Sequence, residues 1–310
     1  MTYALVFPGQ GSQYAGMGLE LAKQYREAQA VFKEADAALG RPLSSLIENG
    51  PREELALTWN TQPAILTASV AVFRALSSRV SLRPIAMAGH SLGEYSALVA
   101  SGAMEFSDAV RIVEKRGQFM QEAVPVGEGA MYAVLGLDTA RVEAICAEHS
   151  TGGKLAAVAN DNCPGQVVIS GHADTLLKVA EALKSAGAKR AVKLEVSAPF
   201  HCSLMNPAAE KLAGELAKVK FSTPIFPVVA NADAKRNTDS ARIPELLRKQ
   251  VFSPVLWQGC VKALSEMGAD TFIEVGPGKV LSGLIKRIEE KAAVLNVENA
   301  ETLDACIKVL

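Results

Sequence analysis

The chain has 310 residues, 49% of them hydrophobic and 21% charged, a balance typical of a globular protein that excludes disorder as the main state. The formal net charge of -1 argues against nucleic acid as the main ligand, because such a ligand needs a strongly basic face. The 5 cysteines are widely spaced and form no Cys-x-x-Cys pair, so neither a disulfide framework nor a zinc site is expected.

The ends and the apolar runs of the chain bear on its location. Residues 1–8 lack the basic segment and the long apolar core of a signal peptide. The best apolar run, residues 64–73, is too short to span a membrane and ends at Arg74. We therefore expect a soluble, cytoplasmic protein without a metal site.

Short apolar strands alternate with amphipathic helical segments, which is typical of a parallel sheet covered by helices. In chain order, strands are expected at residues 3–7, 85–88, 225–230, 271–275 and 293–297. Helices are expected at residues 20–39, 61–78, 94–100 and 107–124. Prolines and glycines, including the Gly276-Pro277-Gly278 turn, separate these segments.

The middle of the chain has a different order of elements. Strands are expected at 129–136, 155–160, 166–170 and 190–196, with helices at 139–148 and 173–186. This βαββαβ order is that of the ferredoxin-like unit. Turn residues at both flanks predict an insert at 125–198 within a larger domain formed by 1–124 and 199–310.

Gly89-His90-Ser91-Leu92-Gly93 matches the Gly-x-Ser-x-Gly pattern of a nucleophile elbow. An apolar strand leads into it and a helical stretch leads out, so Ser91 is expected at the carboxyl edge of a sheet and at a helix N-terminus. Free N–H groups there can receive an oxyanion. The alternative is a serine in a glycine-rich turn that only caps a helix.

A serine nucleophile needs a base, and the chain has 4 histidines. His90 adjoins Ser91 on a sharp turn, so a packing role is favoured for it. His149 and His172 fall in polar segments of the insert and are expected at the surface. His201 follows Pro199-Phe200, where the chain re-enters the larger domain, and is the favoured base. The neighbouring Cys202 is a rival nucleophile, although a buried small side chain is the better interpretation.

Two glycine-rich loops invite a nucleotide-binding interpretation that their spacing does not support. Gly9-Gln10-Gly11 follows the first strand, but Gly-x-Gly-x-x-Gly fails at Tyr14. The Gly276-Pro277-Gly278-Lys279 loop lacks the upstream glycine and the trailing Ser or Thr of a phosphate loop. The first loop could instead supply a second oxyanion donor beside the Leu92 N–H.

Arg116 shares a helical stripe with Ile112 and Met120, which would direct its guanidinium toward apolar surroundings. A buried arginine needs an anion, and no carboxylate lies on that stripe. The carboxylate of a substrate, held at two points, would supply one.

Together these features resemble the malonyl-CoA:acyl carrier protein transacylase family of bacterial type II fatty acid synthesis, from one end of the chain to the other. The residues that carry the resemblance are 7–13, 89–93, Arg116 with Met120, Asn160 with 166–171, 197–201, Gln250 and 274–278. The resemblance implies an α/β-hydrolase-like core with a parallel sheet and an inserted ferredoxin-like domain, which agrees with the element order above.

The resemblance also implies roles for single residues. Ser91 would be the nucleophile and His201 the base, with the backbone carbonyl of Gln250 orienting the imidazole. The N–H groups of Gln10 and Leu92 would form the oxyanion hole. The remaining residues expected at the substrate are Arg116 for the malonyl carboxylate, with Met120, Asn160 and Phe200.

The implied reaction is a ping-pong transfer from malonyl-CoA to the phosphopantetheine thiol of acyl carrier protein, with no permanently bound cofactor. Acyl carrier proteins are acidic, so docking requires a local basic cluster. The candidates are Lys189 with Arg190 at the edge of the insert, and Lys286 with Arg287 near the C-terminus. A monomer is expected.

Two other functions fit parts of the sequence. An α/β-hydrolase esterase or thioesterase would want a His-Gly-Gly-Gly oxyanion loop and a carboxylate partner for the histidine, and neither is evident. An inactive carrier-protein-binding scaffold would need none of Ser91, His201 and Arg116. Acyl transfer therefore accounts for more of the sequence than either alternative.

Overall fold

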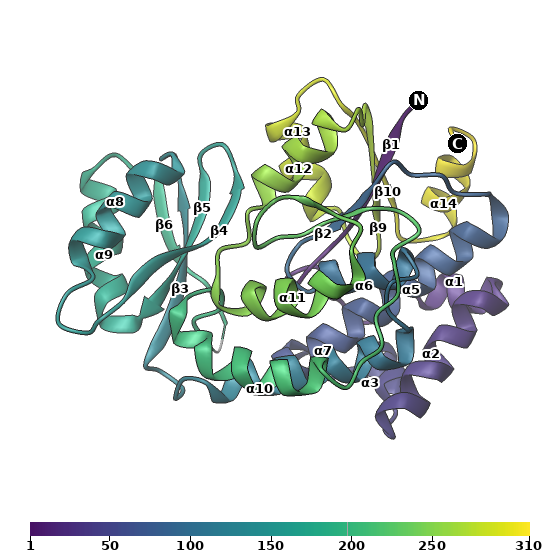
Figure 1. The fold of residues 1–310 in the computed structure, drawn as a ribbon, viewed down its shortest axis with the longest axis horizontal. Helices are drawn as coiled ribbons and strands as arrows, with labels where there is room; N and C mark the ends of the chain where they lie inside the picture. The colour runs from purple at the N-terminus through teal and green to yellow at the C-terminus, as the bar shows by residue number, and fades with distance from the viewer. Residues whose placement is uncertain (197) are drawn as a thin grey trace.

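The computed structural model describes residues 1–196 and 198–310. Figure 1 shows two units side by side: a larger one built from both ends of the chain and a smaller one, in teal, built from its middle. Each unit has its own sheet and its own hydrophobic core. The α/β class with an inserted second sheet is confirmed, whereas the boundaries at 124/125 and 198/199 stay a prediction.

The larger sheet has the strand order β10-β9-β1-β2-β7-β8. Neighbouring strands are parallel except β7 and β8. The strands are β1 (Tyr3–Phe7), β2 (Met87–Gly89), β7 (Val228–Val229), β8 (Arg236–Asn237), β9 (Thr271–Val275) and β10 (Ala293–Val297). Three expected strands match to the residue, but the strand expected at 225–230 is reduced to β7. Pro224 and Pro227 explain this, because proline has no N–H for a strand ladder.

Helices cover both faces of this sheet (Figure 1). They are α1 (Leu19–Gln24), α2 (Arg26–Leu39), α3 (Leu43–Asn49), α4 (Arg52–Ala56), α5 (Thr58–Arg79), α6 (Gly93–Ala100), α7 (Phe106–Glu122), α10 (Asn206–Leu216), α11 (Ile243–Phe252), α12 (Trp257–Glu266), α13 (Val280–Ile288) and α14 (Ala300–Ile307), with 3-10 turns η1 (Ser203–Met205) and η2 (Ser240–Arg242). No helix among the described residues is both long and apolar enough to cross a membrane.

Strand β1 is apolar without interruption because both of its faces are buried. Leu5 and Phe7 point into the core shared with α5, α6 and α7, whereas Ala4 and Val6 point into a second core beneath α12 and α13. Successive side chains of a strand alternate between faces, and here both faces are covered.

The single helix expected over 20–39 is wrong. Tyr25 is extended, with φ -121° and ψ 119°, and separates α1 from α2. The hydroxyl of Tyr25 accepts a hydrogen bond from Arg79 at 2.8 Å, and the Arg79 guanidinium lies 5.9 Å from the centre of the tyrosine ring. These contacts join the break to the end of α5.

The insert has the expected ferredoxin-like order, and its antiparallel sheet runs β4-β5-β3-β6. Its elements are β3 (Gly129–Leu135), α8 (Thr139–His149), β4 (Ala156–Cys163), β5 (Gln166–His172), α9 (Ala173–Ser185) and β6 (Arg190–Lys193). One sheet face packs under α8 and α9, while Met131 and Val168 on the other face join the core of the larger domain. The site described next lies on that second face.

Candidate active site

Ser91 lies in the turn between β2 and α6, at the carboxyl edge of the larger sheet. Its φ of 50° is in the left-handed region, which costs a non-glycine residue about 1–3 kcal/mol unless its surroundings hold it there. A Cβ on Gly89 would collide with the backbone of Gly93, and one on Gly93 with the carbonyl of Phe7. The sharp strand-to-helix turn predicted from the sequence is therefore confirmed.

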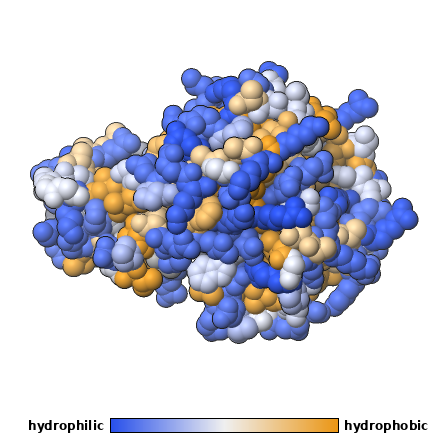
Figure 2. Space-filling view, turned by 60° about the horizontal axis from the view of Figure 1, so that its bottom comes forward, coloured by the Kyte–Doolittle hydropathy of each residue, from blue (hydrophilic) through white to orange (hydrophobic). Residues whose placement is uncertain are grey.

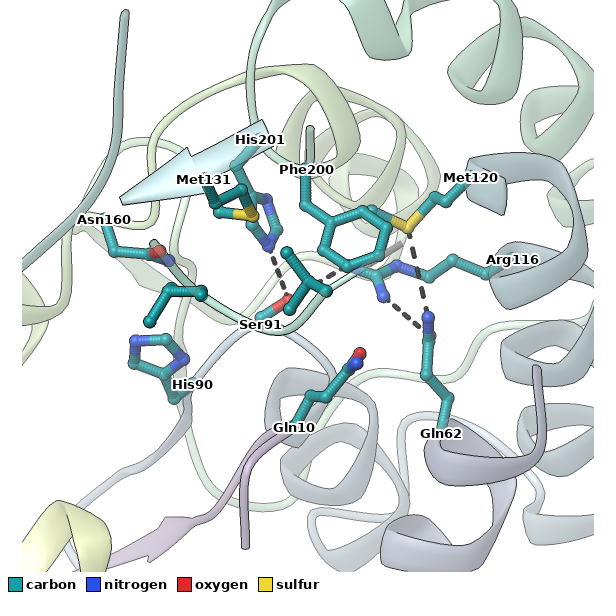
Figure 3. A pocket seen from close by; sticks show the side chains of 12 residues that line it. Gln10, Gln62, His90, Ser91, Arg116, Met120, Met131, Asn160, Phe200 and His201 are labelled. Atoms are coloured by element: carbon teal, nitrogen blue, oxygen red, sulfur yellow. Dashed lines mark hydrogen bonds between the residues drawn. The ribbon is translucent and has the colours of Figure 1, made fainter. Parts of the chain in front are cut away.

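His201 lies opposite Ser91, on the segment that returns from the insert (Figure 3). Its Nε2 is 2.7 Å from the Ser91 Oγ, and its Nδ1 is 2.9 Å from the backbone carbonyl of Gln250. A carbonyl only accepts, so Nδ1 carries the proton and Nε2 is left to accept from the serine. His201 also has a positive φ, 59°. Strained backbone thus occurs at both members of the pair, as is common at functional sites.

Gln250, on α11, is fully buried and connects several parts of the site. Its Nε2 donates to the carbonyl of Ser91 at 2.9 Å, and its Oε1 accepts from Arg116 at 2.9 Å. Sequence reasoning anticipated its backbone carbonyl beside His201 but not these side-chain contacts.

Arg116, on α7, is 2% exposed, and its guanidinium reaches the serine. It donates to the Ser91 Oγ at 3.1 Å and to Oε1 of Gln62 at 2.6 Å. The guanidinium carbon lies 5.7 Å from the centre of the Tyr95 ring, within the range of a cation–π contact. Burial lowers the pKa of Arg116, but an arginine starts high enough to stay charged.

The structure adds contacts that the sequence did not reveal. Gln62 on α5 anchors Arg116 and lies 4.0 Å from the sulfur of Met120. Glu94 and Asn231 are buried behind the serine. No motif marks these residues, because their role comes from packing between elements far apart in the chain.

Burial and charge act together on His201. Its pKa is lowered to about 3, first by desolvation and then by the nearby Arg116 charge, while the bond to Gln250 opposes the shift. The imidazole is therefore neutral at ordinary pH and can accept a proton. Burial raises the pKa of Glu94 to about 7, against the hydrogen bonds it accepts.

A pocket of about 120 Å³ opens over the Ser91–His201 pair. The expected substrate residues Arg116, Met120, Asn160 and Phe200 all line it, and so does Gln10, which was expected in the oxyanion hole. Figure 3 shows these side chains around Ser91, with Met131 contributed by the insert. The pocket therefore lies between the two domains.

A wider groove of about 440 Å³ adjoins this pocket and shares Gln10, His90 and Asn160 with it. The groove runs between the amide side chains of Asn162 and Gln166 and the apolar start of α13. Two bulges in β4 and a bridge from Asn160 to Val255 hold this wall against the larger domain.

The remaining histidines and Cys202 lie away from the reacting pair. The Nε2 of His90 is 2.9 Å from the Asn162 amide oxygen, and its ring packs against Trp257, as a packing role predicts. His149 ends α8 and His172 ends β5, so both lie on elements rather than in loops; both are partly buried, which is not the surface position expected. Cys202 is buried and its thiol donates to the Pro199 carbonyl, with burial raising its pKa.

The second glycine-rich loop is occupied by protein carboxylates. Glu298 accepts from the Gly278 N–H at 2.8 Å, and Glu274 accepts from the N–H groups of Leu281 and Ser282 at 3.0 and 2.7 Å. These donors are not available to a phosphate. No group of three or more His, Cys, Asp or Glu that could hold a metal ion occurs within residues 1–196 and 198–310.

The four docking candidates are all exposed. Lys189 and Arg190 lie at the start of β6. Arg287 on α13 is not free, because it donates to the Gln166 side chain and to the Pro164 carbonyl, both at 2.7 Å. It therefore links the larger domain to the insert. On the face seen in Figure 2, hydrophilic side chains cover most of both domains and hydrophobic ones form small scattered patches.

Comparison with known proteins adds independent information. Residues 4–307 match the family model described as the acyl transferase domain. The chain is 51% identical over 305 residues to the malonyl CoA-acyl carrier protein transacylase of Salmonella typhimurium, covering 98% of each chain. A crystal structure of an acyl carrier protein S-malonyltransferase from Vibrio cholerae is 46% identical, with a TM-score of 0.96 over 99% of this chain and 100% of that one. A malonyl-transacylase solved with a type II PKS acyl-carrier protein is 45% identical, with a TM-score of 0.97 over the whole of both chains.

Proposed function

Because this chain belongs to the acyl transferase family, in which its relatives are malonyl CoA-acyl carrier protein transacylases, we propose that its chemistry proceeds through a malonyl ester of Ser91. The chain is an acyltransferase that moves the malonyl group from malonyl-CoA to acyl carrier protein. The residue roles below are the proposal, and the geometry around Ser91 supports them.

In the first half-reaction, Nε2 of His201 removes the Ser91 proton as Oγ bonds to the thioester carbon. The tetrahedral intermediate collapses, the carbon–sulfur bond breaks, and His201 returns the proton to the CoA thiolate. The phosphopantetheine thiol of acyl carrier protein then attacks malonyl-Ser91 in the reverse sense. The Oγ–Nε2 distance of 2.7 Å and the neutral imidazole suit this proton transfer.

The intermediate places negative charge on the former carbonyl oxygen. We assign its stabilisation to the N–H groups of Gln10 and Leu92, from the loop after β1 and the start of α6. Neither N–H donates a hydrogen bond to an atom of the described residues. The Gln10 side chain is tied back by Thr58 at 3.0 Å, which leaves its backbone beside the pocket.

The observation that carries the choice of substrate is the buried Arg116. No carboxylate of the described residues pairs with it directly, and its Nε–H has no acceptor among them. A buried, unpaired donor is costly, so the site is built for an anion. The free carboxylate of a malonyl group, bonded through Ser91, would meet that guanidinium, with Met120 and Phe200 excluding water from the acyl pocket.

We assign the adjoining groove to the pantetheine arm shared by CoA and acyl carrier protein. Its apolar walls suit the arm's methylene groups, and Asn162 and Gln166 can meet its amides. The groove ends near α13, so the carrier protein would dock there and at the insert edge, on Lys189, Arg190, Lys286 and Arg287. A monomer stays a prediction. All five cysteines are free thiols, which supports the cytoplasmic location that we propose.

One incubation separates this function from the two alternatives. The protein is mixed with radiolabelled malonyl-CoA and phosphopantetheinylated acyl carrier protein, and the label is followed. Transfer yields malonyl-acyl carrier protein and free CoA in equal amounts. A thioesterase would release malonate instead, and a binding scaffold would leave malonyl-CoA intact; either result contradicts the proposal.

A further inference from the structure

A buried carboxylate lies directly behind the nucleophile, and none of the roles above uses it. Glu94, in the first turn of α6, is 2% exposed. Its Oε2 accepts a hydrogen bond from the backbone N–H of Asn231 at 2.9 Å and another from Nε2 of Gln250 at 2.7 Å. Burying a carboxylate costs free energy. We therefore expect the two hydrogen bonds that Glu94 accepts to have a role in the fold.

On one side, Glu94 supports the backbone of the elbow through Asn231. The Asn231 side chain accepts from the N–H of Ser91 at 2.7 Å and donates to the carbonyl of Gly89 at 2.8 Å. Asn231 thus holds the backbone on both sides of His90, including that of Ser91, whose φ is 50°. The Asn231 main chain is in turn held by Glu94.

On the other side, Glu94 fixes the amide of Gln250. Because Nε2 donates to Glu94 and to the Ser91 carbonyl, Oε1 must face Arg116, from which it accepts at 2.9 Å. The main chain of the same glutamine accepts from His201 at 2.9 Å. The same glutamine therefore holds the guanidinium through its side chain and the imidazole through its main chain.

We propose that Glu94 is a positioning residue. One carboxylate oxygen holds Asn231 and Gln250, and through them it keeps the Ser91 elbow, His201 and Arg116 in their relative positions. Glu94 touches neither the substrate nor the reacting atoms. This role rests on the proposed function of Ser91, His201 and Arg116. What it requires is an acceptor oxygen at this point, which glutamine can supply and leucine cannot.

The test compares Glu94→Gln and Glu94→Leu with the unchanged protein. For each, kcat and KM are measured with malonyl-CoA and acetyl-CoA, and Ser91 is labelled with a neutral sulfonyl fluoride. Glu94→Leu should lower kcat for malonyl transfer by about 10²-fold, the usual effect of misplacing reacting groups by about 1 Å. It should slow labelling and reduce malonyl transfer more than acetyl transfer. Glu94→Gln should restore all three readouts close to those of the unchanged protein.

Glu274 provides the matched control, since it is also fully buried and accepts from backbone N–H groups, at the start of α13. Glu274→Leu should lower stability while leaving the labelling rate and the malonyl-to-acetyl ratio unchanged. Unchanged labelling and kcat in Glu94→Leu would overturn the proposal. So would a Glu94→Gln protein as impaired as Glu94→Leu, because charge rather than an acceptor would then matter.

If Glu94→Leu does not fold, Asn231→Ala decides, because it removes the side chain through which Glu94 supports the elbow. It should slow labelling and both acyl transfers, and normal labelling would overturn the proposal. Labelling by the sulfonyl fluoride involves no malonyl group. If the unchanged protein is labelled at Ser91 but transfers no malonyl group, that result refutes the proposed function and not the role of Glu94.

Discussion

Arg116 and His201 share the Ser91 hydroxyl, and the charge on one affects the ionisation of the other. Desolvation, and then the Arg116 charge, lower the pKa of His201 to about 3. Since a lowered pKa keeps the base neutral, kcat/KM should be level from about pH 5 to 8, without the fall near 6.5 that an ordinary histidine produces. A pH profile of kcat/KM with acetyl-CoA, which lacks a carboxylate, measures this. A fall in kcat/KM near pH 6.5 would contradict this lowered pKa and would indicate an ordinary histidine.

Arg116→Ala tests the choice of acyl group. A site built around a buried polar partner can reject the analogue that lacks it by about 10⁴–10⁵. The variant should lose malonyl transfer and keep, or increase, acetyl transfer, as kcat/KM for both thioesters will show. Arg116→Lys keeps the charge without the two-point geometry. Its kcat/KM for malonyl transfer should therefore lie between those of the unchanged protein and of Arg116→Ala. Equal losses for both thioesters would mean that Arg116 is structural.

The residues that sequence could identify are those with a local signature. Ser91 lies in a Gly-x-Ser-x-Gly turn, and Arg116 lies on an apolar helical stripe. Glu94 and Asn231 have no such signature. The hydrogen bonds that join them to the site form only when folding brings β7 and α11 beside α6. Likewise, the tie between Arg287 and Gln166 depends on how the two domains meet.

At the scale of elements, the turn from β2 into α6 leaves no room for a side chain at its second glycine. A Cβ on Gly93 would collide with the Phe7 carbonyl in β1. Gly93→Ala should therefore lower the free energy of unfolding by about 1–3 kcal/mol and impair acyl transfer. Denaturant unfolding measures the first effect.

Gly283→Ala is the matched control, because a Cβ at this position on α13 meets nothing within 4 Å. It should raise the free energy of unfolding by about 0.5–1 kcal/mol, since alanine favours a helix. Equal effects of the two substitutions would show that the close approach at Gly93 is unimportant.

Elements with strong periodicity were predictable, and those shaped by packing were not. Strands β1 and β9 are buried on both faces and β10 is partly buried, so apolar residues dominate their sequences and made them predictable. The break at Tyr25 was not predictable, since no proline or glycine within residues 20–39 marks it and its contact with Arg79 joins segments far apart in the chain. Helices α10 to α13 lie in the part of the chain after residue 199, for which the sequence predicted strands and no helix.

At the scale of the whole molecule, the docking surface that we propose lies where the groove opens, between the insert and α13. Lys189→Glu with Arg190→Glu should raise the KM for acyl carrier protein several-fold and weaken its salt dependence, leaving the KM for malonyl-CoA unchanged. Arg287 is less suitable for this test, because reversing its charge would also cut the link between the domains.

The control reverses two exposed cations, Lys23 on α1 and Lys33 on α2, at the opposite end of the molecule (Figure 1). These changes should leave both KM values alone. An equal rise in both KM values for the Lys189/Arg190 variant would remove these residues from docking.

The ferredoxin-like order of the insert was predictable, because strand and helix periods alternate clearly within it. Its position over the site was not, since the bridge from Asn160 to Val255 and the burial of Met131 join segments distant in sequence. The acyl pocket is a property of the assembled domains, although most of its lining residues could be named beforehand.

The central claim is that the malonyl group rests on Ser91 between two half-reactions. Incubating the protein with malonyl-CoA alone, followed by intact mass and peptide mapping, tests it most directly. We expect one malonyl adduct per chain at Ser91 and none on a folded Ser91→Ala variant. An adduct of unchanged yield on Ser91→Ala, or transfer to acyl carrier protein by that variant at the original rate, would contradict it.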